Sequence, residues 1–315
     1  MSEKVTEKGG QKIGLIGLSA LVFGMMVGAG IFNIPQNMAA SAGLPGVVIS
    51  WVVTAAGMLL LVLTFKCLED HHPELDAGIY QYARKGFGPF SGFITGWGYW
   101  LCTAFSNVAY AVMLNDTFGA FFPRLLHHGW PTVIFISALI WAFYFIVGAG
   151  IKTAKMLTTA LSVVKISAIA AILLMLWLVI DKGMLSATFS TDFSVTGTGL
   201  GTQVKDSMMV TLWCFIGIEG AVIMSGRAKR SSDIGKAGVI GFVTAWLLYL
   251  GMSVLSFGLM PQNELRELTD PSVAYLLRDA YGSWAYYSVI WAVIISFGRM
   301  GSLDPCVRRS ALQRS

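Results

Sequence analysis

Residues 24–35 read G-M-M-V-G-A-G-I-F-N-I-P and lie inside an apolar stretch long enough to cross a membrane. Because glycine lowers helix stability by about 1 kcal/mol relative to alanine, Gly24, Gly28 and Gly30 predict an unwound segment in this first helix. Unwinding exposes the backbone N–H groups of Gly28, Ala29 and Gly30 at the positive end of the following half-helix. That geometry suits an anionic group, such as the carboxylate of an amino acid. The alternative is that Gly24-x-x-x-Gly28 is only a close-packing face between helices.

A second interrupted helix is predicted near residue 217. Residues 212–221 read L-W-C-F-I-G-I-E-G-A, with Gly217 and Gly220 inside the sixth apolar segment. Two broken helices five segments apart indicate an inverted repeat of five helices. We therefore predict a first repeat over about residues 13–181 and a partial second repeat over about 203–298.

The sixth segment also carries two candidate functional side chains. Glu219 lies eight residues before Arg227, which puts its carboxyl near the membrane interior. Burial there costs several kcal/mol unless the carboxyl is protonated or paired, so Glu219 is a candidate proton carrier or gate residue. The alternative is a structural carboxyl bonded to a neighbouring helix. A break at Gly217 would let Trp213 present its ring to a bound cation, whereas the commoner position of a tryptophan in such a segment faces lipid.

Two further polar residues lie inside predicted helices. Lys165 follows Lys155 by ten residues, about 15 Å at 1.5 Å per residue, or half of a hydrocarbon core roughly 30 Å thick. It is a candidate for coupling, with a fixed structural ion pair as the alternative. Asn107, with Thr103 and Tyr110 one turn away on either side, forms a polar stripe that lines a cavity or bonds to another helix.

The composition indicates a multi-pass, all-α membrane protein. Apolar residues make up 55% of the 315 residues, charged residues 12%, and the mean hydropathy is +0.67. Between Lys12 and Lys66, 53 consecutive positions carry no formal charge. We predict a transmembrane domain over residues 13–298 with outer loops at 181–202 and 261–271. Its eight predicted helices begin near Ile13, Pro45, Pro89, Pro131, Lys152, Gln203, Gly235 and Gly282.

The distribution of lysine and arginine predicts the orientation. With residues 1–12 as a cytoplasmic segment, 16 of the 22 Lys and Arg residues lie on the cytoplasmic side and five lie outside. The net charge of +5 is therefore mostly this bias and gives no reason to expect a nucleic-acid partner.

Motifs of catalysis and metal binding are not found in the sequence. It contains no Ser-His-Asp order, P-loop, zinc motif or dinucleotide fingerprint, so we predict neither an enzyme nor a cofactor. The four cysteines lack C-x-x-C spacing, and we interpret them as packing residues, not as metal ligands.

Four motifs together resemble one known family. They are G-A-G-I-F (28–32), P-E-L-D-A-G-I-Y-x-Y-A-R-x-G-F-G (73–88), G-W-G-Y-W-L (96–101) and T-L-W-x-F-I-G-I-E-G-A (211–221). The chain resembles the basic amino acid and polyamine antiporters of the amino acid-polyamine-organocation superfamily, and the arginine/ornithine antiporters of bacteria in particular. The resemblance extends from about Lys12 to Ser296.

The resemblance implies a twelve-span fold of five-plus-five inverted repeats in the lipid bilayer of the bacterial inner membrane. It implies exchange of external arginine for internal ornithine, with cationic amino acids as substrates. It leaves a homodimer open as the assembly.

The resemblance also implies roles for individual residues. Backbone amides of Gly28, Ala29 and Gly30 would bind the substrate carboxylate, although many relatives have serine in place of Ala29. Carbonyls around Ile216 would take the α-amino group, Trp213 would cover the aliphatic stem, and Asn107 would hydrogen-bond nearby. Tyr99 and Glu219 would be gate residues. Lys165 would occupy the place of a sodium ion in related folds, bridging the fifth helix to the broken first one.

The end of the chain departs from the family. Residues 294–315, I-I-S-F-G-R-M-G-S-L-D-P-C-V-R-R-S-A-L-Q-R-S, become polar and basic where family members continue an eighth span and add four more. We expect residues 299–315 to form an atypical tail, and the truncated second repeat to leave a chain that keeps most substrate contacts but does not complete alternating access alone. The alternatives are another cationic pair, such as lysine with cadaverine or arginine with agmatine, and a non-transporting binding component or remnant.

Overall fold

The computed structural model describes residues 13–72, 75, 78–127, 129–148, 151–191, 199–223, 228–230 and 232–296. The predicted segments 1–12 and 299–315 lie outside these residues. The described part is helical, with one isolated bridge between Ile13 and Ala228. Its helices are α1 (Leu15–Met26), η1 (Ala29–Asn33), α2 (Ile34–Ser41), α3 (Leu44–His71), α4 (Ile79–Phe87), α5 (Pro89–Phe118), η2 (Pro123–His127), α6 (Trp130–Gly148), α7 (Ile151–Val179), α8 (Lys182–Thr191), α9 (Leu200–Cys214), α10 (Gly220–Ile223), α11 (Ser232–Phe257), α12 (Gln262–Leu265), α13 (Ser272–Tyr281) and α14 (Ser283–Ser296).

An observed helix begins within three residues of each of the eight predicted starts. The largest differences are at α9 and α11, where the helix extends into polar residues that the hydropathy pattern had excluded. The prediction of a loop over 181–202 is wrong in its first half, because α8 lies there. The carboxylate of Asp181 accepts hydrogen bonds from the N–H groups of Gly183 and Met184, which starts this helix.

Among the residues that the structure describes, two helices, α3 and α11, are individually long and apolar enough to cross a membrane. Two bent pairs also qualify if each is one span: Leu15–Met26 with Ala29–Ser41, bent by 52°, and Val164–Val179 with Lys182–Phe189, bent by 89°. The described residues therefore form a multi-pass helical membrane protein with two to four spans by length and composition. The count of eight spans and the inverted repeat remain predictions.

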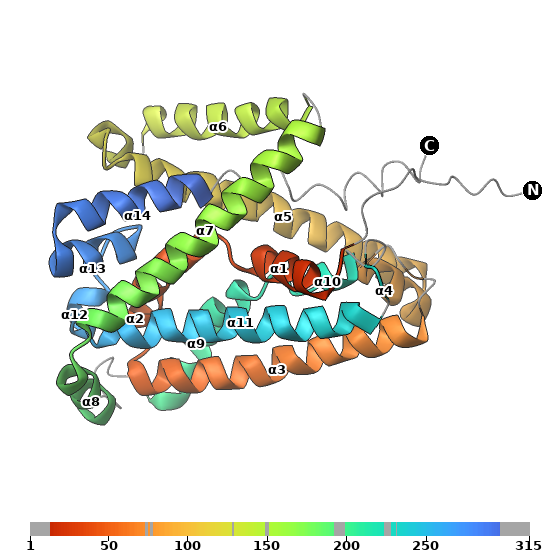
Figure 1. Ribbon diagram of the computed structural model, residues 1–315, viewed down its shortest axis with the longest axis horizontal. Coiled ribbons are helices and arrows are strands. Elements are labelled where there is room, and N and C mark those ends of the chain that lie inside the picture. The colour runs from red at the N-terminus through yellow and green to blue at the C-terminus, as the bar shows by residue number, and fades with distance from the viewer. Residues whose placement is uncertain are drawn as a thin grey trace, which may run out of the picture.

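The helix α11 packs against several other helices of the bundle. It runs beside α3, packs against α1, and is crossed obliquely by α7 (Figure 1). At its centre Tyr249 stacks on Trp51 of α3, with ring centroids 5.6 Å apart, and Trp51 Nε1 donates a hydrogen bond of 2.9 Å to Ser253 Oγ. These buried side chains hold α3 and α11 in register. In contrast, α6 lies at the edge of the bundle and exposes aromatic side chains, as expected of a helix facing lipid.

Two aspartates lie together outside the predicted spans. Asp270, in the loop before α13, has a carboxylate oxygen that is buried without a hydrogen-bond partner among the described residues. Asp116, in the last turn of α5, accepts a hydrogen bond from Asn115. Burial, and second the negative charge of Asp116, raise the pKa of Asp270 to about 6.

Replacing Asp270 by asparagine is expected to stabilise the protein at neutral pH. Between pH values of about 4 and 6 the unfolded chain has lost this proton and the folded chain retains it, so the free energy of unfolding falls as pH rises. With solvent screening allowed for, we expect a gain of about 1 kcal/mol above pH 6, or roughly 2–4 °C in melting temperature. Thermal unfolding of the purified chain in detergent measures this gain.

The same difference should vanish below about pH 4, where both states carry the proton. The exposed Asp279 offers a control, since Asp279→Asn should change the melting temperature by about 1 °C at most. An equal gain from Asp270→Asn at both ends of the pH range would contradict the electrostatic explanation.

Candidate functional site between two broken helices

The first break lies between α1 and η1. The helix α1 ends at Met26, and Gly28 has an extended backbone with φ −95° and ψ −168°. Side chains from other helices satisfy the carbonyl groups that the break releases. Tyr249 Oη of α11 donates a 2.9 Å hydrogen bond to the Met26 carbonyl, and Lys165 Nζ of α7 donates to the Val27 carbonyl. Side chains of α11 and α7 therefore stabilise the break from two sides.

The second break lies between α9 and α10. The helix α9 ends at Cys214 and α10 begins at Gly220, with turns between them. Gly217 has φ +106°, a conformation that residues with a Cβ rarely adopt. A Cβ at Gly217 would also come within 2.5 Å of the Met25 carbonyl oxygen. The two broken helices thus touch each other, and the glycine permits both the turn and the contact.

Glu219 links the second break to α5 and also bonds to a backbone group within the break. Its carboxylate accepts a 2.9 Å hydrogen bond from Tyr99 Oη and a 3.1 Å hydrogen bond from the Gly217 N–H. The residue is only 7% exposed. Because a buried carboxylate is costly without donors, these two bonds stabilise its position between α5 and the broken helix.

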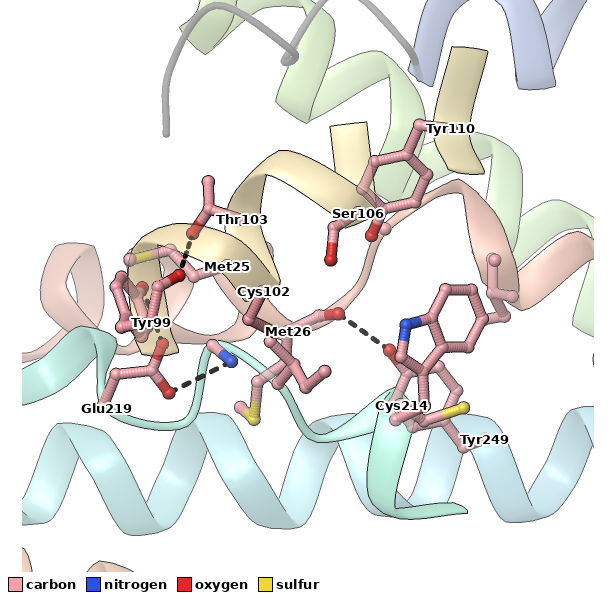
Figure 2. Close-up of a pocket in the computed structure, with 16 residues that line it drawn as sticks. Met25, Met26, Tyr99, Cys102, Thr103, Ser106, Tyr110, Cys214, Glu219 and Tyr249 are labelled. Atoms are coloured by element: carbon pink, nitrogen blue, oxygen red, sulfur yellow. Dashed lines mark hydrogen bonds between the residues drawn. The ribbon is translucent and has the colours of Figure 1, made fainter. Parts of the chain in front are cut away.

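A pocket opens where the two breaks meet α5 (Figure 2). Trp213 lies over the first break, so that a Cβ at Gly30 would come within 3.0 Å of its ring. Tyr99 and Glu219 lie at one end of the pocket, and Tyr110 and Ser106 lie at the other. The lining residues are Met25, Met26, Gly28, Gly30, Ile31, Tyr99, Cys102, Thr103, Ser106, Tyr110, Trp213, Cys214, Ile216, Gly217, Glu219 and Tyr249.

Six of the nine residues singled out from the sequence lie in this lining: Gly28, Gly30, Tyr99, Trp213, Ile216 and Glu219. Ala29 is buried beside the pocket, and Lys165 is buried behind the first break. Asn107 is not a lining residue, and its Oδ1 is buried without a hydrogen-bond partner among the described residues. At about 100° per residue, Asn107 lies roughly 70° to one side of the α5 face that carries Thr103, Ser106 and Tyr110.

Several lining residues were not identified from the sequence. Ser106 lies three residues after Thr103 and so lies on the same face of the helix, which is the signal in the sequence that indicates it. Cys102 is exposed and lines the pocket, so its interpretation as a packing residue is wrong. Tyr249 lies within an apolar run of α11, and nothing in that run distinguishes a tyrosine that faces the pocket from one that faces lipid.

Comparison with known proteins identifies the family. Residues 13–303 match the family described as amino acid permease. The chain belongs to the amino acid permease family. This permease chain is 43% identical over 288 residues to the arginine/agmatine antiporter of Chlamydia abortus, a match that covers 88% of the chain and 58% of the relative. It is 42% identical over 304 residues to the arginine/ornithine antiporter of Pseudomonas aeruginosa, covering 95% of the chain and 61% of the relative.

A putative amino-acid transporter of Clostridium perfringens is 40% identical over 298 residues, covering 91% of the permease chain and 61% of that relative. The chain therefore spans about 60% of the length of these relatives. The match to the family includes both breaks and all of α5, so every lining residue of the pocket lies within it.

Proposed function

We propose that this permease chain carries the substrate site of a basic amino acid antiporter of the bacterial inner membrane, which exchanges arginine for ornithine with its N-terminus in the cytoplasm. The observation that carries the proposal is the meeting of two broken helices in one pocket, with the Trp213 ring over Gly30. The relatives from Chlamydia abortus and Pseudomonas aeruginosa are named as arginine antiporters, which supports the substrate class.

The substrate contacts follow from the chemistry of the lining. Backbone N–H groups of Gly28, Ala29 and Gly30 bind the carboxylate, since the start of a half-helix favours an anion. Carbonyl groups near Ile216 accept from the α-amino group. The Trp213 ring covers the aliphatic stem and attracts a cationic side chain. Asn107 contributes only if α5 rotates, because its amide lies to one side of the lining.

We assign gating and coupling to Tyr99, Glu219 and Lys165. The Tyr99–Glu219 hydrogen bond joins α5 to the broken α9–α10 helix, and its rupture would release one wall of the pocket. Lys165 joins α7 to the first break through the Val27 carbonyl. Loss or gain of a proton at Lys165 or Glu219 would change these contacts, which is the physical basis for coupling to protons.

A second substrate pair, arginine with agmatine, is favoured by the similarity to the arginine/agmatine antiporter of Chlamydia abortus. Agmatine is arginine without its carboxylate, so it would forgo the contacts at Gly28–Gly30. Competition of ornithine, agmatine, lysine and cadaverine against labelled arginine separates these pairs. Binding of arginine without exchange in liposomes would instead identify the chain as a binding component.

Replacing Trp213 by alanine tests the proposed site. We expect the dissociation constant of arginine for the purified chain to rise about 10- to 100-fold, because the change removes a cation–π contact and apolar cover worth roughly 1.5–3 kcal/mol. Isothermal titration in detergent measures it. Trp141, 59% exposed on α6, is the matched control, and Trp141→Ala should leave the affinity unchanged. Absence of arginine binding to the unaltered chain at millimolar ligand would overturn the proposed function.

A further inference from the structure

Tyr110 packs its phenol ring against the backbone of Gly28. A Cβ at Gly28 would come within 2.5 Å of Tyr110 Oη and within 3.2 Å of Cζ. The backbone angles of Gly28, φ −95° and ψ −168°, are open to alanine. A side chain at position 28 would therefore meet the phenol of Tyr110, although the backbone conformation itself would tolerate it. The glycine and the tyrosine thus form a close contact between the first break and α5.

The pair lies at the end of the pocket that also holds Ser106. Tyr110 and Ser106 project from α5 toward the first break, whereas Tyr99 and Glu219 lie at the opposite end (Figure 2). Tyr99 and Tyr110 are eleven residues apart on one helix, about 16 Å at 1.5 Å per residue. The Tyr110 hydroxyl is thus next to the backbone of the first break and far from the carboxylate of Glu219.

We propose that Tyr110 is a substrate-binding residue whose hydroxyl donates a hydrogen bond to the substrate carboxylate at Gly28–Gly30. This inference rests on the proposed function and names a residue that determines its specificity. Because the bond requires a carboxylate, Tyr110 makes the site prefer amino acids over the amines that result from their decarboxylation. A hydrogen bond to a charged acceptor is stronger than one between neutral groups, so the preference is substantial.

The test compares arginine with agmatine, which differs from it only by the carboxylate. Tyr110→Phe keeps the ring and removes the hydroxyl. We expect the dissociation constant of arginine to rise about tenfold, the effect of one charge-assisted hydrogen bond, while that of agmatine changes by less than about twofold. The dissociation constants of the purified chain are measured by competition against labelled arginine.

Gly28→Ala provides a second, independent variant. Its Cβ would displace the phenol, so we expect the same loss of arginine affinity with agmatine spared. The double variant Gly28→Ala with Tyr110→Phe should bind arginine no more weakly than Gly28→Ala alone, because both changes remove the same hydrogen bond from the Tyr110 hydroxyl.

Two controls separate this role from a general effect. Thr103 lines the same pocket, but its Oγ1 donates to the Tyr99 carbonyl at 2.9 Å, so Thr103→Val should weaken arginine and agmatine by equal factors if it weakens either. Tyr144, 66% exposed on α6, lies outside the pocket, and Tyr144→Phe should leave both affinities unchanged.

The outcomes are distinct. A tenfold loss for arginine that spares agmatine supports the proposal. An unaltered arginine affinity in Tyr110→Phe, or equal losses for arginine and agmatine, overturns it and leaves the proposed function intact. If the unaltered chain binds no arginine, the proposed function itself fails.

Discussion

Replacing Gly217 by alanine is expected to lower the melting temperature of the purified chain by roughly 6–12 °C and to abolish arginine binding. The φ angle of +106° costs a residue with a Cβ about 1–3 kcal/mol. The new Cβ would in addition meet the Met25 carbonyl oxygen at 2.5 Å, a backbone atom that cannot move without displacing α1. Together these effects amount to about 3 kcal/mol, which corresponds to the stated temperature shift. Thermal unfolding in detergent and titration with arginine measure the two results.

The control for this prediction is Gly57→Ala on α3. A Cβ at Gly57 meets no atom within 4 Å, and its helical backbone favours alanine by about 1 kcal/mol. We therefore expect Gly57→Ala to leave arginine binding unchanged and the melting temperature equal or slightly higher. If Gly217→Ala behaved like Gly57→Ala, the contact between the two broken helices would not exist as described.

Replacing Glu219 by alanine is the second change for which we expect a large effect, in this case on the free energy of unfolding. The change leaves Tyr99 Oη and the Gly217 N–H without their acceptor in a buried site. Each bond to a carboxylate is worth about 1.5–3 kcal/mol, so we expect a loss of about 3 kcal/mol of unfolding free energy. Denaturation of the purified chain measures the loss. Glu264, exposed in α12, is the control, and Glu264→Ala should change the stability by less than about 0.5 kcal/mol.

Glu219→Gln separates a gate from a proton carrier. Its amide oxygen can still accept from Tyr99, but its NH₂ group cannot accept from the Gly217 N–H, so about half of the stability loss should remain. If Glu219 exchanges a proton when substrate binds, the arginine affinity of the unaltered chain changes with pH and that of Glu219→Gln does not. An identical pH profile in both chains would leave Glu219 as a gate without a proton role.

Much of the helical order could be predicted from the sequence because its causes are local. Charge-free apolar runs predicted helix starts within three residues of those of α1, α3, α5, α6, α7, α9, α11 and α14. The glycines at 24, 28 and 30 and those at 217 and 220 predicted both breaks, since a missing Cβ weakens a helix whatever surrounds it. Gly24 nevertheless lies within α1, and Gly220 begins α10. The loop predicted at 181–202 failed because the Asp181 carboxylate supplies a helix start that outweighs a Ser- and Gly-rich composition.

The candidate site was predictable only in part, because the face of a helix that lines a pocket depends on its neighbours. Sequence spacing selected a stripe of Thr103, Asn107 and Tyr110 on α5. Thr103 and Tyr110 do line the pocket, but the packing of that helix leaves Asn107 to one side and turns Ser106 inward. The sequence left Trp213 ambiguous between a position facing lipid and one facing a binding site, and the structure places its ring over Gly30. No local signal could assign Tyr249 to the Met26 carbonyl, since these residues are 223 positions apart.

The sequence by itself determined that this is a multi-pass helical membrane protein with two interrupted helices and a buried carboxyl in the second. Hydrophobic runs, helix-breaking glycines and the cost of a charge in an apolar interior are properties of short segments. Only the tertiary structure decided that the two breaks touch at Met25 and Gly217, that α7 and α11 cap the carbonyls of the first break, and that Tyr110 lies against Gly28. These contacts join residues far apart in the chain, and they form only when the helices pack against one another.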